Sequence, residues 1–224
     1  MTDEELRTWL GDCPVLFHMA ERGSWPSIRK HGLLSTSALL DLFEVAGAKR
    51  DAIEAQRRSE NVPITHENFG SAVVRDQKPM DDSGLRRCLQ DNLQPSDWYR
   101  LLNSRVFFWL SKQRLHRLLN AAAYREKEHD VLELDAAPIV EKHLNDIRLA
   151  PINTGCTKPM PHPRGLETFQ TVNDYPYDYW RSRRPKWDCV TELAVVRGVP
   201  EVAPYVRRVV VMKGEEVIST LWER

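Results

Sequence analysis

Residues 15–40 constrain the fold of this chain most, because they place a short apolar run directly before a compact helix signal. The run 15–17 leads to His18, and the helix signal begins at Ser24. Serine is a favoured N-cap, a proline stands in the first turn and Gly32 follows the last turn, which is the usual asymmetry of a short helix. The segment therefore predicts a strand that ends near His18 and a helix between Ser24 and Gly32.

Hydrophobic periodicity places further elements along the rest of the chain. Helices are expected over residues 3–10, 38–58 with an interruption near Gly47, 84–93, 95–102, 111–119 and 136–143. Strands are expected over residues 71–75, 105–110, 130–135, 147–152, 187–196, 206–212 and 216–222. The run 105–110 is aromatic and apolar nearly throughout, so it should lie in the middle of a sheet. This pattern predicts a single domain over residues 1–224, of the α+β class.

Composition excludes several classes of function. The chain has 32 Lys and Arg against 32 Asp and Glu, so a nucleic acid would have to be held by a local basic patch. The longest apolar runs are too short to cross a bilayer and the N-terminus lacks a secretory signal, so we expect a cytoplasmic protein without a membrane partner. Scattered cysteines without a CxxC pair, and histidines without metal-ligand spacing, predict buried thiols and no metal site.

One segment has the composition of such a local basic patch. Residues 173–187 interleave tyrosine and tryptophan with arginine and lysine. Cations beside flat aromatic faces suit phosphates and unstacked bases, although charge runs are often only solvated surface. The residues that we expect to contact a substrate here are Arg181, Arg183, Arg184 and Trp187.

Glu192 stands in the middle of the strand predicted directly after this segment. A carboxylate is costly to bury without a partner. Glu192 is therefore either a functional group or a side chain on the exposed face of an edge strand, and the sequence leaves both interpretations open.

The segment around His18 resembles a known family. A strand that ends in His, a short helix containing Trp25 and Pro26, and the sequence HGLL are similar to the first NAD-binding segment of the ADP-ribosyltransferase superfamily. The similarity is greatest to the DarT group, which modifies DNA bases. The resemblance implies an ADP-ribosyltransferase-like split β-sheet core with flanking helices, in which NAD lies between two small, roughly perpendicular sheets. In this segment it assigns to NAD the residues His18, Gly32, Leu33 and Ser35.

Two further segments extend the resemblance. A basic stretch after the first helices is similar to the family's QxRR segment with its active-site arginine, and Arg58 or Arg57 matches it. Arg75 is a second candidate for that arginine. The aromatic strand is similar to the family's FYF strand, so Phe107 and Phe108 would stack on nicotinamide. The family's tyrosine is absent here, so the resemblance implies stacking without a hydroxyl contact.

Glu192 completes the resemblance, because the family's catalytic glutamate also lies on a strand after a substrate-reading loop. The implied function is an NAD-dependent ADP-ribosyltransferase, an enzyme of the glycosyltransferase class, in which Glu192 and either Arg58 or Arg75 are catalytic. The implied acceptor is a nucleic-acid base in single-stranded DNA, and a toxin of this kind would have a macrodomain-type antitoxin as its partner. The alternatives are a protein, small-molecule or RNA-phosphate acceptor, or a non-catalytic nucleotide-binding module.

Overall fold

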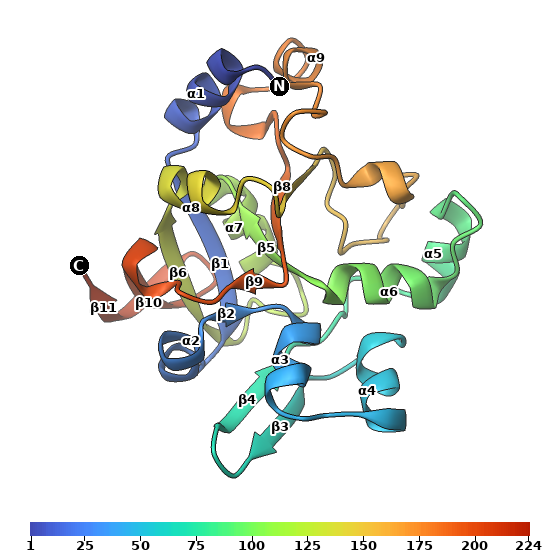
Figure 1. Ribbon diagram of the computed structural model, residues 1–224, viewed down its shortest axis with the longest axis vertical. Coiled ribbons are helices and arrows are strands. Elements are labelled where there is room, and N and C mark those ends of the chain that lie inside the picture. Colours follow the sequence, from blue (N-terminus) through green and yellow to red (C-terminus); the bar gives the residue numbers. More distant parts are fainter.

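A seven-stranded antiparallel sheet forms the centre of the molecule (Figure 1). The computed structural model describes residues 1–224. The strand order is β11-β10-β6-β1-β5-β8-β7, and every neighbouring pair is antiparallel. The strands are β1 (Val15–Glu21), β5 (Arg105–Trp109), β6 (Glu128–Asp135), β7 (Ile147–Ala150), β8 (Glu192–Val196), β10 (Val206–Lys213) and β11 (Glu216–Glu223). β5 lies between β1 and β8, which confirms the prediction that the aromatic run is central.

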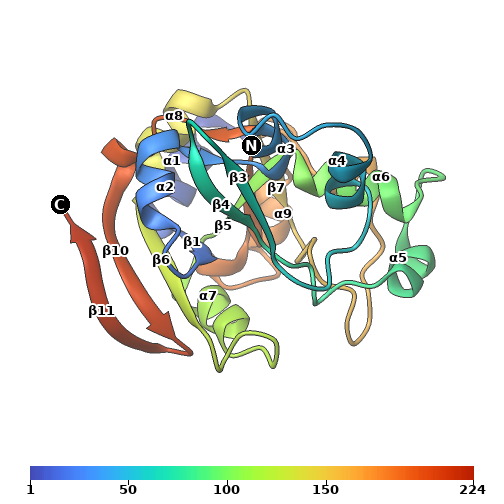
Figure 2. The same cartoon turned by 90° about the horizontal axis from the view of Figure 1, so that it is seen from below.

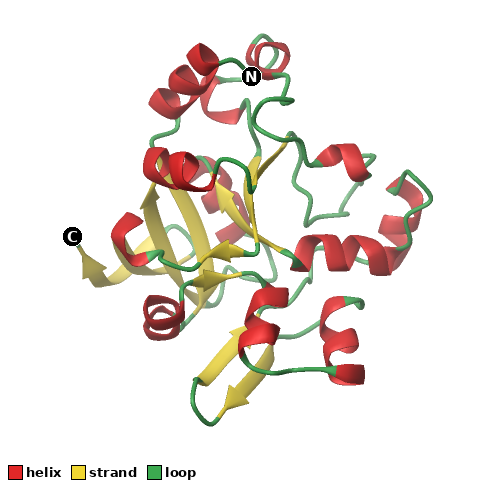
Figure 3. Ribbon diagram, in the orientation of Figure 1, coloured by secondary structure: helices red, strands yellow, loops and turns green.

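Two small sheets and a set of short helices surround the large sheet (Figure 3). The small sheets pair β2 (Leu33–Leu34) with β9 (Gly198–Val199), and β3 (Val62–His66) with β4 (Gly70–Val74). The α-helices are α1 (Asp3–Asp12), α2 (Trp25–His31), α3 (Thr36–Leu42), α4 (Gly47–Glu54), α5 (Asp82–Cys88), α6 (Pro95–Asn103), α7 (Lys112–Leu119), α8 (Ala136–His143) and α9 (Tyr177–Arg181). Single 3₁₀ turns are η1 (Leu166–Thr168), η2 (Lys186–Asp188) and η3 (Ala203–Tyr205). The mixture of helices and strands agrees with the predicted class.

The large sheet is nearly divided between β1 and β5. β1 pairs with β6 along its whole length, whereas β1 and β5 share only the pair Phe17–Trp109. Four strands therefore lie on one side of this junction and three on the other. The family resemblance implied two small, roughly perpendicular sheets, whereas the structure joins two groups of strands into one sheet at a single pair.

Helices cover both faces of the large sheet. On one face, Leu16, Leu132 and Leu193 belong to a core that includes residues of α1 and α8. On the other face, Phe17 and Val131 pack in a core with residues of α7. Because a sheet buried on both faces specifies its register strongly, the positions of side chains along β1, β5 and β8 are well determined.

The β3–β4 hairpin forms a smaller unit with α3 and α4. Figure 2 shows this hairpin in front of the large sheet when the molecule is viewed from below. The unit has its own core, to which Leu40, Phe43, Ile53 and Ile64 contribute. This unit therefore packs around its own core and lies beside the large sheet.

Besides the two-residue strands β2 and β9, the sequence did not predict β3 and α9. β3 contains Pro63 and buries only Ile64 of its five residues, so it lacks the apolar alternation of a sheet strand. α9 has five residues and lies within the segment 173–187, which was interpreted as a loop. Both elements are too short or too polar for periodicity to reveal them.

The N-terminus of α2 is capped differently from the prediction. Ser24 stands at the expected N-cap, but its side chain makes no capping hydrogen bond. Asp130 of β6, which is fully buried, accepts hydrogen bonds from the backbone amides of Gly23 and Trp25 instead. The cap thus comes from a distant strand.

None of the helices combines the length and the apolar character needed to span a membrane.

Candidate functional site

A cleft of about 730 Å³ opens beside the junction where β1 and β5 part. Its walls come from β1, α2, β2, β4, β5 and α7, and from the loop 153–156. The predicted site residues that line it are His18, Gly32, Leu33, Ser35, Arg58, Arg75, Phe107 and Glu192. The predicted site residues outside its lining are Phe108, Arg181, Arg183, Arg184 and Trp187. The structure therefore gathers most of the predicted residues in one place.

His18 lies on β1 just past the junction with β5. Its Nδ1 is 2.9 Å from the backbone oxygen of Phe107 and donates to it, because a carbonyl can only accept. Burial lowers the pKa of His18 to about 4, so the ring is neutral at pH 7. With the proton on Nδ1, Nε2 is a hydrogen-bond acceptor that has no partner in the protein, on a residue that lines the cleft.

Glu192 is the first residue of β8, rather than a residue in the middle of a strand, and lies between Trp109 and Ala150 of the neighbouring strands. It is only 4% exposed, and β8 is an inner strand, which rules out the edge-strand interpretation. Thr154 donates twice to Oε2, from its backbone nitrogen at 3.1 Å and its hydroxyl at 2.6 Å. Burial raises the pKa of Glu192 to about 7, although these hydrogen bonds oppose the rise. Oε1 has no partner in the protein.

Two residues that the sequence did not mark hold this carboxylate in place. The backbone oxygen of Thr154 accepts hydrogen bonds from Arg164 Nη1 at 2.8 Å and from Trp98 Nε1 at 3.3 Å. Arg164 is 1% exposed and its guanidinium lies over the ring of Trp98. The only sequence signal for Arg164 is its place at the end of the proline-rich segment 151–164.

β2 brings backbone atoms to the cleft through two glycines with positive φ, Gly32 (90°) and Gly198 (114°). A Cβ atom on Gly32 would collide with the backbone oxygen of Pro200, and one on Gly198 with that of Leu33. The close pairing of β2 with β9 therefore requires glycine at both positions. Ser35 caps α3, since its hydroxyl accepts a hydrogen bond from the backbone amide of Ala38 in the first turn.

Arg75 follows β4 and reaches across the cleft to β1. Its Nη1 donates to the backbone oxygen of Met19 at 3.0 Å, and its guanidinium lies over the ring of Tyr124. Nε is buried without a hydrogen-bond partner, 3.9 Å from the carboxylate of Glu21. Nη2 makes no hydrogen bond with the protein. Of the guanidinium nitrogens of Arg75, Nη2 is therefore the donor left for a ligand, because Nε is buried.

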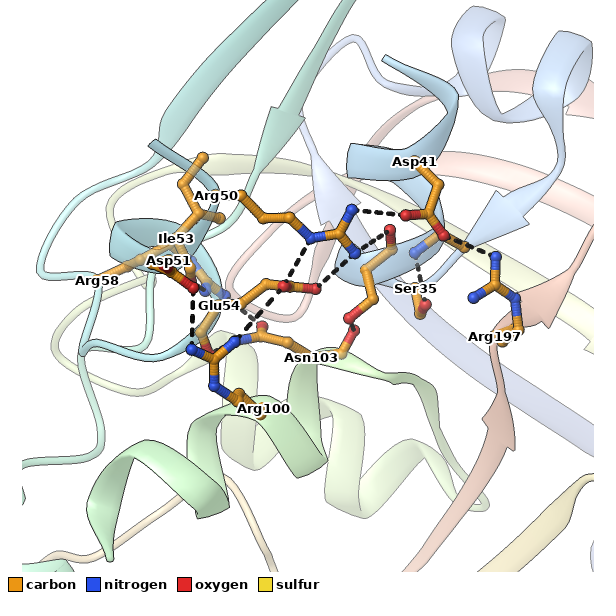
Figure 4. Close-up of polar contacts among 12 residues, drawn as sticks. Ser35, Asp41, Arg50, Asp51, Ile53, Glu54, Arg58, Arg100, Asn103 and Arg197 are labelled. Atoms are coloured by element: carbon orange, nitrogen blue, oxygen red, sulfur yellow. Dashed lines mark hydrogen bonds and ion pairs between the residues drawn. The ribbon is translucent and has the colours of Figure 1, made fainter. Parts of the chain in front are cut away.

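Arg58 also lines the cleft, but its guanidinium serves the protein (Figure 4). Nε donates to the backbone oxygen of Arg75 at 2.9 Å, Nη2 to Asn103 Oδ1 at 3.0 Å, and Nη1 to the backbone oxygen of Ile53. Burial lowers the pKa of Arg58 to about 10. Arg57 is outside the lining and donates to the backbone oxygen of Met80. Of the candidate arginines, the geometry favours Arg75 for contact with a ligand.

Ion pairs fix the elements around Arg58. Arg50 pairs with Asp41 at 2.6 Å and with Glu54 at 2.8 Å, and Arg100 of α6 pairs with Asp51 at 2.9 Å (Figure 4). These contacts join α3 to α4 and α4 to α6. The wall that carries Arg58 is therefore braced against the rest of the molecule.

The aromatic strand β5 contributes Arg105, Val106, Phe107 and Trp109 to the lining of the cleft. Phe107 and Trp109 line it, whereas Phe108 is 1% exposed and packs in the main core. Successive strand residues point to opposite faces, which explains this division. Phe108 therefore packs 5.8 Å from the ring of His18 as a support and does not reach the cleft.

The basic and aromatic segment 173–187 lies away from the cleft, and its arginines contact the chain itself. Arg181 pairs with Asp12 of α1 at 3.4 Å. Arg183 lies over the ring of Tyr179 at 3.8 Å. The expectation that this segment reads the acceptor receives no support from the lining of the cleft.

Arg184 links the same segment to the strands that hold Glu192. Its guanidinium lies over the ring of Trp180 at 4.0 Å and donates to the backbone oxygen of Pro151 at 2.7 Å. A weaker hydrogen bond reaches the hydroxyl of Thr191 at 3.3 Å. Arg184 thus fastens the ends of β7 and β8.

The cleft is more basic than the chain as a whole. Charged residues in its lining are six arginines and three carboxylates, namely Arg22, Arg58, Arg75, Arg105, Arg114, Arg117, Glu21, Asp76 and Glu192. A cleft of this kind concentrates anions even when the net charge of the protein is zero. No group of three or more His, Cys, Asp and Glu side chains lies close enough to hold a metal ion.

A protein-family model matches residues 14–206 of the chain, and these residues include the whole lining of the cleft. That model is described as a family of unknown function, DUF7002. No curated protein matches the sequence. Since the match extends over most of the chain, the protein belongs to the DUF7002 family.

Proposed function

We propose that this protein is an NAD-dependent ADP-ribosyltransferase with an ADP-ribosyltransferase-like fold, whose acceptor is a base in single-stranded DNA. The observation that carries the proposal is the pairing of Glu192 and His18 in one cleft. Glu192 is buried and His18 is half-buried, each has one polar atom fixed by the protein, and each keeps the other atom, Oε1 or Nε2, without a partner. The parting of β1 and β5 beside them supports the split-sheet fold.

NAD⁺ would act as a co-substrate that supplies a ribosyl carbon, whose bond to nicotinamide breaks as positive charge develops on the sugar. Glu192 would accept a hydrogen bond from a ribose hydroxyl through Oε1 and stabilise that charge in its ionised form. His18 would accept a second hydroxyl through Nε2. Both groups are held before the ligand arrives, which is the condition for strong electrostatic stabilisation of a transition state.

The remaining lining residues suit the other parts of the dinucleotide. Gly32 and Leu33 expose backbone to the cleft, and Ser35 supplies a hydroxyl beside them. Phe107 offers an aromatic face for nicotinamide. Arg75 lines the cleft and its Nη2, which makes no hydrogen bond with the protein, would donate to the pyrophosphate or to the acceptor base; no metal is required for any of these contacts.

The nucleic-acid acceptor is supported by the excess of arginine in the cleft. A macrodomain-type hydrolase that removes ADP-ribose would then be the expected antitoxin partner of a toxin with this activity. Cytoplasmic localisation would follow from that role, since both DNA and NAD⁺ are present in that compartment.

Incubation with labelled NAD⁺ tests the proposal directly. The purified protein is mixed with single-stranded oligonucleotides, duplex DNA, RNA or protein extract, and the label is followed into each acceptor. We expect label in single-stranded DNA, and none with Glu192→Gln. Label only in RNA or protein would keep the enzyme class and change the acceptor. NAD⁺ binding without any transfer would instead indicate a nucleotide-binding module.

A further inference from the structure

We infer that Thr154 is the positioning residue of Glu192: it holds Oε2 so that Oε1 alone is presented to the cleft. This inference rests on the proposed function for the chemistry that Oε1 performs. Thr154 lies in the loop after β7, and both its backbone nitrogen and its hydroxyl donate to the same oxygen. Two donors on one oxygen fix the plane of the carboxylate as well as its position.

The loop that carries Thr154 is itself anchored, so the positions of its two donors are fixed. Arg164 donates to the backbone oxygens of Thr154, Cys156 and His162 at 2.8, 2.9 and 3.0 Å. Trp98 of α6 also donates to the first of these oxygens, at 3.3 Å. A buried arginine thus ties three points of one loop together, and α6 ties the loop to the body of the molecule.

The same contacts govern the ionisation of Glu192. Burial favours the neutral acid, while the donors of Thr154 and the charges of Arg164 and Arg114 favour the carboxylate. Arg114 comes from α7 and is paired with Asp188, and His18 on β1 is neutral at pH 7. Thr154 therefore provides the nearest contacts that favour the ionised form and oppose the rise in the pKa of Glu192.

A second buried threonine in the same loop offers a matched control. Thr157 is 1% exposed, as is Thr154. Its hydroxyl accepts from the amide of Asp81 at 3.1 Å and donates to the backbone oxygen of Pro79, so it supports the loop without touching Glu192. Thr154→Val and Thr157→Val therefore remove the same hydroxyl from two sites with different neighbours.

The test is a titration of the Glu192 carboxyl carbon by NMR in protein labelled with ¹³C-glutamate, with the signal assigned by its loss in Glu192→Gln. We expect Thr154→Val to raise the midpoint of this titration by about one pH unit. Thr154→Ser and Thr157→Val should leave the midpoint within about 0.3 unit, because the hydroxyl on Glu192 is retained. Thr154→Ala replaces the valine variant if thermal melting shows that the latter does not fold.

Transfer kinetics give a second readout. In Thr154→Val the acid limb of the rate against pH should move upward by the same amount, with kcat reduced about tenfold and the KM for NAD⁺ unchanged. An unchanged titration midpoint in a folded Thr154→Val protein would overturn the inference. A shifted midpoint in a protein that never consumes NAD⁺ would refute the proposed function and leave the positioning of Glu192 standing.

Discussion

Two regions of the molecule are rich in polar and charged groups: the cleft lining that contains Glu192, and the segment 173–187. They differ in whether these groups have hydrogen-bond or stacking partners within the protein. In the cleft wall, Glu192 and His18 each leave one polar atom without a protein partner. In the segment 173–187, Arg183 and Arg184 lie over neighbouring aromatic rings and donate to backbone oxygens. A segment rich in basic and aromatic residues can therefore either pack against itself or bind nucleic acid. Only the contacts of each side chain show which of the two applies.

The largest effect expected from this contrast is on catalysis. Glu192→Gln keeps the shape of the side chain and an acceptor for Thr154 but removes the charge. If the carboxylate stabilises developing positive charge, single-turnover transfer should fall by about 100-fold or more, with little change in NAD⁺ affinity. A well-folded variant that transfers ADP-ribose at the wild-type rate would remove Glu192 from the mechanism.

The same substitution should stabilise the fold in a pH-dependent way. The folded-state pKa of Glu192 is raised to about 7 from an ordinary value of 4.5, so the folded protein holds this proton more tightly than the unfolded chain. The contribution of Glu192 to stability is therefore complete below about pH 4.5 and is lost as the pH rises through 7. At pH 8 we expect the free energy of unfolding of Glu192→Gln to exceed that of the wild type by about 2 to 3 kcal/mol.

Urea unfolding at pH 8 and pH 5 measures this difference. At pH 5 most of the wild-type carboxyl is protonated in the folded state, so the two proteins should differ by less than about 1 kcal/mol. An equal gain at both pH values would mean that the charge is not the cause. The pH dependence thus separates an ionisation effect from better packing of the amide.

Much of the fold could be predicted because its strands are apolar and its helices are capped locally. β5, α7 with its Ser111 cap, and the β10–β11 hairpin follow directly from such signals. The candidate site was predicted only in part. Glu192 stands at the start of a recognisable strand. His18 lies in the middle of another, because β1 continues to Glu21 and does not end near His18 as the sequence predicted. Thr154 instead acts through a contact across 38 positions of the chain that no local pattern encodes.

The same limit explains why the two arginines could not be ranked from the sequence. Arg58 and Arg75 both follow a regular element and both precede polar loops. The difference between them lies in their partners, since Arg58 donates from every guanidinium nitrogen and Arg75 does not. Tertiary contacts, rather than residue type, assign one to the structure and the other to the ligand.

Replacing each of these two arginines by glutamine tests whether Arg58 supports the fold and Arg75 binds the ligand. Arg58→Gln should lower the free energy of unfolding by about 2 kcal/mol, because it leaves buried carbonyl oxygens without donors. Arg75→Gln should weaken NAD⁺ binding about tenfold while changing stability less than Arg58→Gln does. Urea unfolding and calorimetry with NAD⁺ measure the two quantities. If Arg58→Gln weakened binding more than Arg75→Gln in fully folded protein, the assignment of roles would be reversed.

The smallest effects are expected on substitution of two exposed arginines, Arg117 and Arg183. These substitutions test whether the nucleic-acid acceptor binds along the cleft or along the segment 173–187. Arg117 lines the cleft on α7 and makes no ion pair with the protein, whereas Arg183 already lies over Tyr179. Each phosphate contact adds about 0.7 to the salt slope of single-strand binding. We therefore expect Arg117→Ala to flatten the slope for a single-stranded oligonucleotide by about one contact and Arg183→Ala to leave it unchanged. The opposite result, a flattened slope with Arg183→Ala alone, would return the acceptor to the segment 173–187 and limit the cleft to NAD⁺.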